Sequence, residues 1–349
     1  MAQDFFREGL RWRAPGLAQA ADQLPKSEID IYPRPLSDYA GRVVKLKLTI
    51  AYDGTRYQGW QVQKIGTGVQ ELVEGALGRL FPSRPRLHGS SRTDTGVHAL
   101  GMVAHFILSR GEFKMPVRKL ALAMNAHLPE DIRVLSAVRA KPDFHARFGA
   151  RGKQYRYLIW NHPAMNPLLR RTAWHVPRKL DLTLMRGAAA GFVGRHDFQS
   201  FTANPGYGRA NTVRTLTRCD VKKRGPQFTV VVEGDGFLYK MCRGIVGTLV
   251  QVGLGKFPLG EIAFMLACKD RRVAGMTAPA HGLVLWKVFY GKTPKSKTQT
   301  PKNLEIPISK PHISHAARGV RSAGRRPVTG LAHMEQAKPA ASRRSGEPG

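Results

Sequence analysis

The sequence has few cysteines, few acidic residues and no long apolar run. Its three cysteines, Cys219, Cys242 and Cys268, lie far apart and show no CxxC spacing. This spacing argues against a disulfide framework or a cysteine zinc site and favours a reducing cytoplasm. No apolar run approaches the roughly 18 residues that a membrane span requires. The first ten residues contain acidic side chains and no apolar stretch, so we expect neither a secretory signal nor membrane attachment.

The shortage of acidic residues leaves a large positive charge. The 349 residues include 56 Lys and Arg but only 24 Asp and Glu, a net charge of +32. Residues 1–44 are neutral, residues 291–349 carry +9, and residues 45–290 carry 38 basic and 15 acidic side chains, a net +23. A charge of this size in the main body favours a polyanionic partner, of which nucleic acid is the usual one. The alternatives are a chain kept soluble by its charge and a chain that binds anionic lipid.

Hydropathy divides the chain into four parts. Residues 1–44 show no sustained period and are expected to form a partly irregular extension. Residues 45–160 and 161–290 are dense in periodic apolar residues and are expected to form two similar halves. Residues 291–349 have few large apolar side chains, so burial cannot offset the entropy lost on ordering. We expect this last part to be a basic, disordered tail.

Strand and helix patterns alternate through residues 45–290. Period-two patterns predict strands at 44–52, 98–108, 132–139, 154–160, 212–220, 227–233 and 283–290, and helical spacing predicts helices at 69–81, 117–128, 182–193, 239–252 and 259–268. Hairpins with intervening helices are typical of an α+β fold. We therefore expect the antiparallel sheets of the two halves to form a central sheet, with helices packed on it and a catalytic cleft between the halves.

One polar loop stands out as a candidate for chemistry. Residues 91–99 (SRTDTGVHA) place Asp94 and Arg92 among small residues just before a predicted strand, a position from which a rigid sheet presents reactive groups. Alternatively, Asp94 only stabilises a turn. Basic and aromatic residues also alternate at 153–157 (KQYRY), where Tyr155 shares a strand face with the residues two positions away. Such a face suits phosphate binding and base stacking, although core packing is the alternative for the tyrosines.

Four segments together resemble the tRNA pseudouridine synthase A family. The loop at 91–99 is similar to that family's active-site motif, and residues 52–61 (YDGTRYQGWQ) resemble its first-strand signature. Residues 143–157 resemble its middle segment, and residues 237–247 resemble its late helix. The segments occur in the family's order across residues 45–290.

The resemblance assigns a role to five residues. Asp94 matches the catalytic aspartate, and Tyr155 matches the tyrosine that contacts the target base. Arg92 and Arg243 match basic residues that line the site, and Arg243 is the expected ion-pair partner of Asp94. Leu283 matches an apolar residue of the pocket wall.

The resemblance also implies an activity and partners. It implies an isomerase that converts uridine to pseudouridine at positions 38–40 of the tRNA anticodon stem-loop, acts as a homodimer and needs no cofactor. This chain departs from the family pattern at three positions. Ser91 replaces a glycine, Thr95 occupies a variable position, and Gly244 stands where the family often has Asn. None of these departures removes a reactive group.

Two other functions fit parts of the sequence. Asp94-Thr95-Gly96 spells the aspartic protease triplet, but Arg92 precedes it where apolar strand residues are expected. A non-catalytic RNA-binding protein, in which Asp94 is structural, is the main alternative. The histidines, including His88 and His145, fit no metal-ligand spacing, so we assign no metal.

Overall fold

The computed structural model describes residues 43–63, 65–203 and 211–291. The predicted extension at 1–44 and tail at 291–349 lie outside these residues, apart from the positions that adjoin them. All the elements described below belong to the first of the chain's two compact units, residues 1–297.

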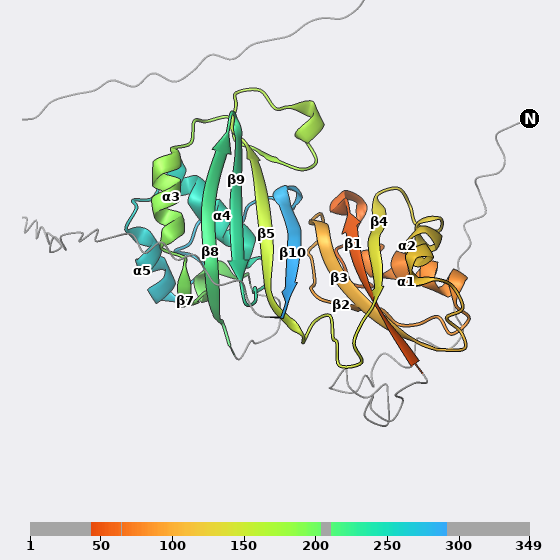
Figure 1. The fold of residues 1–349 in the computed structure, drawn as a ribbon. Coiled ribbons are helices and arrows are strands. Elements are labelled where there is room, and N and C mark those ends of the chain that lie inside the picture. Colours follow the sequence, from red (N-terminus) through yellow and green to blue (C-terminus); the bar gives the residue numbers. More distant parts are fainter. Residues whose placement is uncertain (1–42, 64, 204–210, 292–349) are drawn as a thin grey trace, which may run out of the picture. The chain divides into compact units, whose positions relative to one another are not determined.

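A single mixed sheet of ten strands forms the framework (Figure 1). Its main order is β4-β1-β3-β10-β5-β9-β8-β7, with β2 paired to β3 and β6 paired to β5. The strands are β1 (Val43–Tyr52), β2 (His88–Gly89), β3 (His98–Ser109), β4 (Ile132–Arg139), β5 (Ala150–Trp160), β6 (Trp174–His175), β7 (Gly194–Asp197), β8 (Val213–Arg224), β9 (Gln227–Gly234) and β10 (Leu283–Tyr290). The predicted α+β class is confirmed, and the division into halves at residue 160 stays a prediction.

The last strand, β10, lies in the middle of the sheet. It pairs antiparallel with β5 and parallel with β3, the latter through only Val284 and Leu285, which face His98 and Ala99. This short parallel junction joins the final strand to the beginning of β3. Because β3 starts just after the loop that carries Asp94, the junction brings the end of the described chain to the candidate site.

Helices pack against the sheet and bury alternate strand residues. They are α1 (Val69–Leu80), α2 (Val117–Asn125), α3 (Leu182–Ala190), α4 (Met241–Gly253) and α5 (Glu261–Cys268), with short 3-10 turns η2 (Gly54–Arg56), η3 (Pro167–Leu169), η4 (Gln199–Phe201) and η5 (Ala280–Gly282). In β1, Leu46, Leu48 and Ile50 are fully buried, as a period-two strand with one core face requires. Helix α2 contacts β4, and α3 contacts both α4 and β8.

Some element boundaries differ from the sequence prediction. Strand β5 begins at Ala150, four residues before the predicted start, because β10 continues to pair with it there. Helix α4 begins at Met241 and not at Tyr239, since Lys240 has a left-handed backbone with φ of 58°. The four-residue strand β7 was too short to show a period. None of the helices within the described ranges is long and apolar enough to cross a membrane.

Candidate active site

A tight turn between β2 and β3 presents Asp94. The backbone N–H of Val97 donates to the Asp94 carbonyl at 3.1 Å, and the N–H of Gly96 donates to the Tyr57 carbonyl at 3.3 Å. Gly96 has a φ of 76°, a left-handed conformation that glycine adopts without strain. The turn therefore uses the backbone of Asp94 and leaves its carboxylate to interact elsewhere.

The chain after β1 supports this turn from the side. The Trp60 N–H donates to the Thr93 carbonyl at 3.2 Å, and the Tyr52 hydroxyl hydrogen-bonds the Thr93 hydroxyl at 2.8 Å. Gly59 has a φ of 88°, and a Cβ at this position would lie 2.3 Å from the Thr93 carbonyl oxygen. Only glycine lets the two segments approach so closely.

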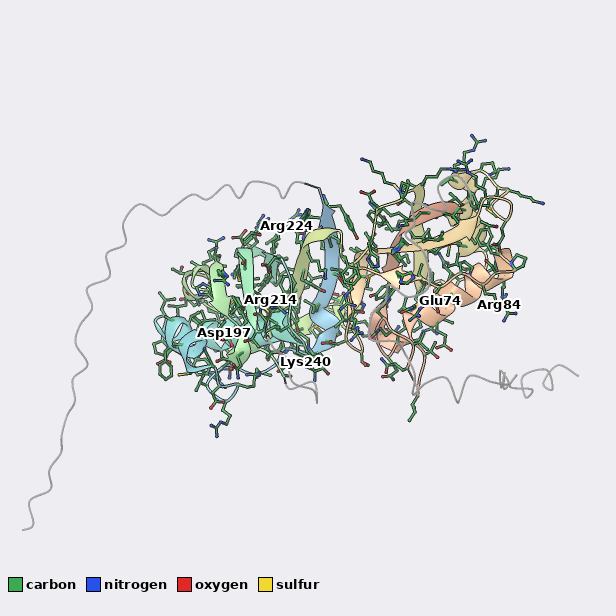
Figure 2. The ribbon with its side chains drawn as sticks, turned by 90° about the horizontal axis from the view of Figure 1, so that it is seen from below. Glu74, Arg84, Asp197, Arg214, Arg224 and Lys240 are labelled. Atoms are coloured by element: carbon green, nitrogen blue, oxygen red, sulfur yellow. The ribbon has the colours of Figure 1, made fainter. Side chains whose placement is uncertain are left out.

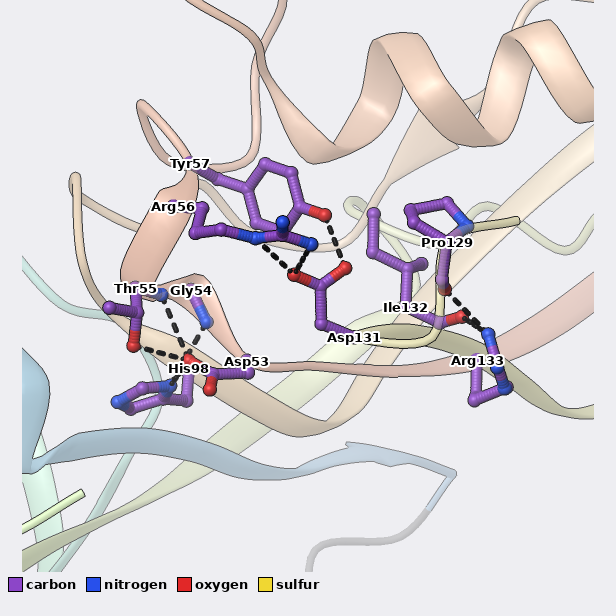
Figure 3. Close-up of polar contacts among 10 residues, drawn as sticks. All are labelled: Asp53, Gly54, Thr55, Arg56, Tyr57, His98, Pro129, Asp131, Ile132 and Arg133. Atoms are coloured by element: carbon purple, nitrogen blue, oxygen red, sulfur yellow. Dashed lines mark hydrogen bonds and ion pairs between the residues drawn. The ribbon is translucent and has the colours of Figure 1, made fainter. Parts of the chain in front are cut away.

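The supporting segment is itself anchored to the start of β4 (Figure 3). Arg56 donates to the Asp131 carboxylate from Nε at 2.9 Å, and the Tyr57 hydroxyl donates to the other oxygen of the same carboxylate. The Asp53 side chain caps η2 by accepting from the Thr55 N–H at 2.9 Å. These contacts fix the segment that packs beneath the Asp94 turn.

Arg243 forms an ion pair with Asp94, as the family resemblance implies. Its Nη1 lies 3.2 Å from Oδ2 of Asp94, and the two side chains are only 14% and 22% exposed. The Nε of Arg243 donates to the Ala278 carbonyl at 2.8 Å, which fixes the guanidinium plane. Arg243 comes from the first turn of α4, so the pair joins two segments 149 positions apart.

Residues 278–281, which we call the clasp, accept hydrogen bonds through backbone carbonyls from three side chains, those of Arg243, Tyr157 and His98. The Ala278 carbonyl accepts from Arg243, and the Pro279 carbonyl accepts from the Tyr157 hydroxyl at 2.7 Å. The His281 carbonyl lies 2.9 Å from Nε2 of His98. Nε2 of His98 also lies 3.0 Å from the Arg171 carbonyl, and because carbonyl oxygens only accept, Nε2 donates to them.

Tyr155 lies on β5 and is 7% exposed. Its ring meets that of Phe237 edge-on, with centroids 4.9 Å apart and planes at 76°. Burial raises the pKa of Tyr155 well above 10, and the negative charge of Asp94 acts in the same direction. The hydroxyl therefore stays protonated at neutral pH.

A cavity of about 580 Å³ joins the predicted site residues. Asp94, Arg92, Tyr155 and Leu283 all line it, and Arg243 contacts it through Asp94. Asp94 is the one acidic residue among the lining side chains, whereas the basic ones are Arg86, Arg92, Arg147, Lys153, Arg214 and Lys240. An excess of cations around a single carboxylate suits a polyanionic substrate that presents one group for reaction.

Two of the three departures from the family pattern are buried, whereas Thr95 is exposed and its hydroxyl donates to Oε1 of Gln58 at 3.2 Å. Ser91 is 9% exposed and lines the cavity. Gly244 lies within α4, where a Cβ would come within 2.7 Å of the Phe201 carbonyl oxygen. The glycine at 244 is therefore a packing requirement in this chain.

Sequence reasoning missed several residues of the site. The clasp has no motif, since its contribution is made by backbone carbonyls. Arg214 is a single basic residue at the start of β8, and no local pattern set it apart from other arginines. Arg147 lies in the 143–148 segment that resembles the family, so the sequence could have indicated it as a candidate site residue. The described residues contain no cluster of His, Cys, Asp and Glu that could hold a metal ion.

The chain is similar in sequence to a family of known proteins. A family model described as tRNA pseudouridine synthase matches residues 48–149 and 188–291. The chain is 44% identical over 245 residues to tRNA pseudouridine synthase A of Acetivibrio thermocellus, which covers 70% of this chain and 99% of that protein. It is 46% identical over 245 residues to the proteins of the same name from Pelobacter propionicus and Geobacter sulfurreducens, with the same coverage.

Proposed function

Because the chain belongs to the tRNA pseudouridine synthase family, and so is an isomerase that converts uridine to pseudouridine in tRNA, we propose that its catalytic carboxylate is Asp94. The observation that carries the proposal is the 3.2 Å pairing of Asp94 with Arg243 at a cavity whose other charged lining residues, among those described, are arginines and lysines. Among the described residues that line the cavity, Asp94 is the only one with a carboxylate.

The reaction explains why these side chains are suited to it. The bond from N1 of the base to C1′ of the ribose breaks, a bond from C5 to C1′ forms, C5 loses its proton and N1 gains one. The target base has to leave the RNA stack before a side chain can reach it. Asp94 acts at the reacting atoms, while Arg243 balances its charge and holds the carboxylate in one orientation.

The remaining predicted residues bind the substrate in this proposal. Tyr155 stacks on the displaced base, and its protonated hydroxyl is held near the reacting centre. Leu283 provides an apolar wall, and the exposed Arg92 contacts the RNA backbone. Asp94 and Tyr155 come from residues 45–160, and Arg243 and Leu283 from residues 161–290, which supports a cleft between the two predicted halves.

We further propose that the targets are the uridines at positions 38–40 of the anticodon stem-loop, that the enzyme is a homodimer and that it acts in the cytoplasm. The target and the dimer follow from the family resemblance, and the free thiols of Cys219, Cys242 and Cys268 support a reducing compartment. Sedimentation at micromolar concentration tests the dimer, and a monomer would contradict it.

Tritium release from tRNA transcripts labelled with [5-³H]uridine tests the reaction and its target together. We expect release from intact transcripts and none from transcripts whose uridines at positions 38–40 are replaced by cytidines. Release that persists after replacement would contradict the proposed target. Tight tRNA binding with no release from any transcript would favour the non-catalytic RNA-binding alternative.

A further inference from the structure

Three basic side chains that line the cavity lie close enough for their charges to interact. Lys153 lies on β5, Arg147 lies in the turn before β5, and Arg214 lies at the start of β8. They come from three different segments, yet the charges of both arginines act on Lys153. Like charges repel, so this convergence is unfavourable unless an anion binds among them.

The end of β9 brings the strands that carry Lys153 and Arg214 close together. Lys153 of β5 faces Gly234 of β9, and Gly234 also faces Leu216 of β8. Strand β9 ends at Gly234, where a Cβ would lie 2.6 Å from Cδ2 of Leu216 and 2.8 Å from the Thr215 carbonyl oxygen, so glycine lets β8 pack closely against this end of β9. Arg214, two positions before Leu216, can therefore reach toward Lys153 across the end of β9.

Acidic partners do not account for the positions of Lys153 and Arg214. Within the described part of the chain, neither Lys153 nor Arg214 forms an ion pair with a carboxylate. Nη1 of Arg214 donates instead to the carbonyls of Asn211 and Val213 at 3.2 and 2.6 Å, which orients the guanidinium without neutralising it. Burial, assisted by the charges of Arg147 and Arg214, lowers the pKa of Lys153 to about 8. Lys153 thus bears a charge at pH 7 in a setting that favours an anionic ligand.

The position of Lys153 relative to Tyr155 suggests which anion binds. The two residues share one face of β5 two positions apart, a separation of about 7 Å along the strand. A base stacked on Tyr155 therefore has its sugar and phosphate within reach of the Lys153 ammonium. We propose that Arg147, Lys153 and Arg214 form a phosphate-binding subsite for one of the two phosphodiesters that flank the target uridine. This subsite rests on the proposed function, because it takes Tyr155 as the residue beneath the base.

The role of the subsite is to hold the RNA backbone while the base leaves the stack. A guanidinium can donate two parallel hydrogen bonds to phosphate oxygens, and an ammonium adds a compact charge. Binding one phosphate here would fix the ribose of the target nucleotide relative to Asp94. The subsite therefore contributes mainly to binding and positioning, and takes no part in bond breaking.

A binding experiment with neutral linkages tests the subsite. Transcripts carry a single methylphosphonate, which has no negative charge, at one of the two linkages that flank the target uridine. For the wild-type protein we expect one of these transcripts to bind about tenfold more weakly than the unmodified transcript. We expect Lys153→Met and Arg214→Met to bind the unmodified transcript more weakly than wild type does. The methylphosphonate that weakens wild-type binding should cause little further loss of affinity in these variants. Lys153→Arg should restore most of the sensitivity.

Two matched variants control for the general loss of charge. Lys222→Met and Arg224→Met remove exposed cations from the far part of β8, and Arg224 stands at the opposite end of that strand from Arg214 (Figure 2). Both controls should keep the wild-type response to the neutral linkage. The slope of log K against log salt should decrease by about one for Lys153→Met and by less for Lys222→Met.

The outcomes separate the subsite from the reaction. One outcome is that the wild-type protein releases tritium, but each neutral linkage weakens transcript binding equally in wild type and in Lys153→Met. That outcome would overturn the subsite and leave the proposed reaction unaffected. Coupling between Lys153 and one linkage without tritium release would support the subsite and contradict the proposed chemistry.

Discussion

The clasp at 278–281 predicts that Tyr157→Phe lowers both stability and turnover, although Tyr157 is not among the cavity-lining residues. The substitution removes one atom, the hydroxyl oxygen that donates to the Pro279 carbonyl at 2.7 Å. Tyr157 is 1% exposed, so water cannot readily replace the lost bond. The ring itself fits the same space, and Gly282 continues to pack against it.

The expected effect on stability follows from one lost bond in a buried site. Leaving the Pro279 carbonyl without its donor should lower the free energy of unfolding by about 1–2 kcal/mol, which corresponds to a decrease in Tm of about 3–6 °C for a domain of this size. A loosened clasp also releases the Ala278 carbonyl that orients Arg243. Because the guanidinium then loses its fixed approach to Asp94, we expect kcat to decrease about tenfold with little change in KM.

Urea denaturation and steady-state tritium release measure the two effects on the same protein. Asn125→Ala provides the control, because it removes hydrogen bonds between α2 and β4 at 2.8 and 3.0 Å, among residues outside the cavity lining. This control should lose comparable stability and keep the wild-type kcat. An unchanged kcat in Tyr157→Phe, or a raised KM with an unchanged kcat, would refute the positioning role of the clasp.

Three further predictions concern other parts of the structure. Gly59→Ala should lower the free energy of unfolding, measured by urea denaturation, by about 2 kcal/mol or more, because a Cβ would lie 2.3 Å from the Thr93 carbonyl oxygen in a strained backbone. The control Gly75→Ala, at a position with open space around it, should not lower the free energy of unfolding. Burial, assisted by the charges of His88, His145 and Lys45, lowers the pKa of His105 to about 3. Between pH 6.5 and 3 the unfolded chain therefore binds a proton that the folded one does not. His105 should contribute a loss of up to about 1.4 kcal/mol of stability per pH unit over this window, and urea titrations of wild type and His105→Asn should show the difference. Finally, tRNA affinity should decrease as the pH rises above about 8, because Lys153, near the charges of Arg147 and Arg214, then loses its proton in the free protein. Binding titrations of Lys153→Arg should show a weaker dependence of affinity on pH.

Local sequence patterns predicted the parts of the fold that depend on periodic burial. The helices and the longer strands between residues 44 and 290 were located because each has one face in the core, as in β1, where Leu46 and Leu48 alternate with more exposed residues. The short strands β2, β6 and β7 were missed. The α+β class followed from their order. The central position of β10 could not be predicted, because it depends on a two-residue parallel contact with β3 that leaves no pattern in either strand.

The candidate site was predicted from the resemblance more than from physical pattern. An Asp in a polar loop is compatible with a turn, and only the four segments in order distinguished Asp94 from a structural residue. The structure brings Asp94, Tyr155, Arg92 and Leu283 to one cavity and pairs Asp94 with Arg243. The clasp and Arg214 depend on contacts between segments distant in sequence, so the chain alone could not indicate them.

The most direct test of the account is single-turnover tritium release by wild type, Asp94→Asn and Asp94→Ala, with tRNA affinity measured for each. Asp94→Asn keeps the size of the side chain and removes only its charge and acid–base capacity. We predict that both variants still bind tRNA and that release decreases by roughly a thousandfold or more. Release near the wild-type rate in either variant would show that the catalytic carboxylate is not Asp94.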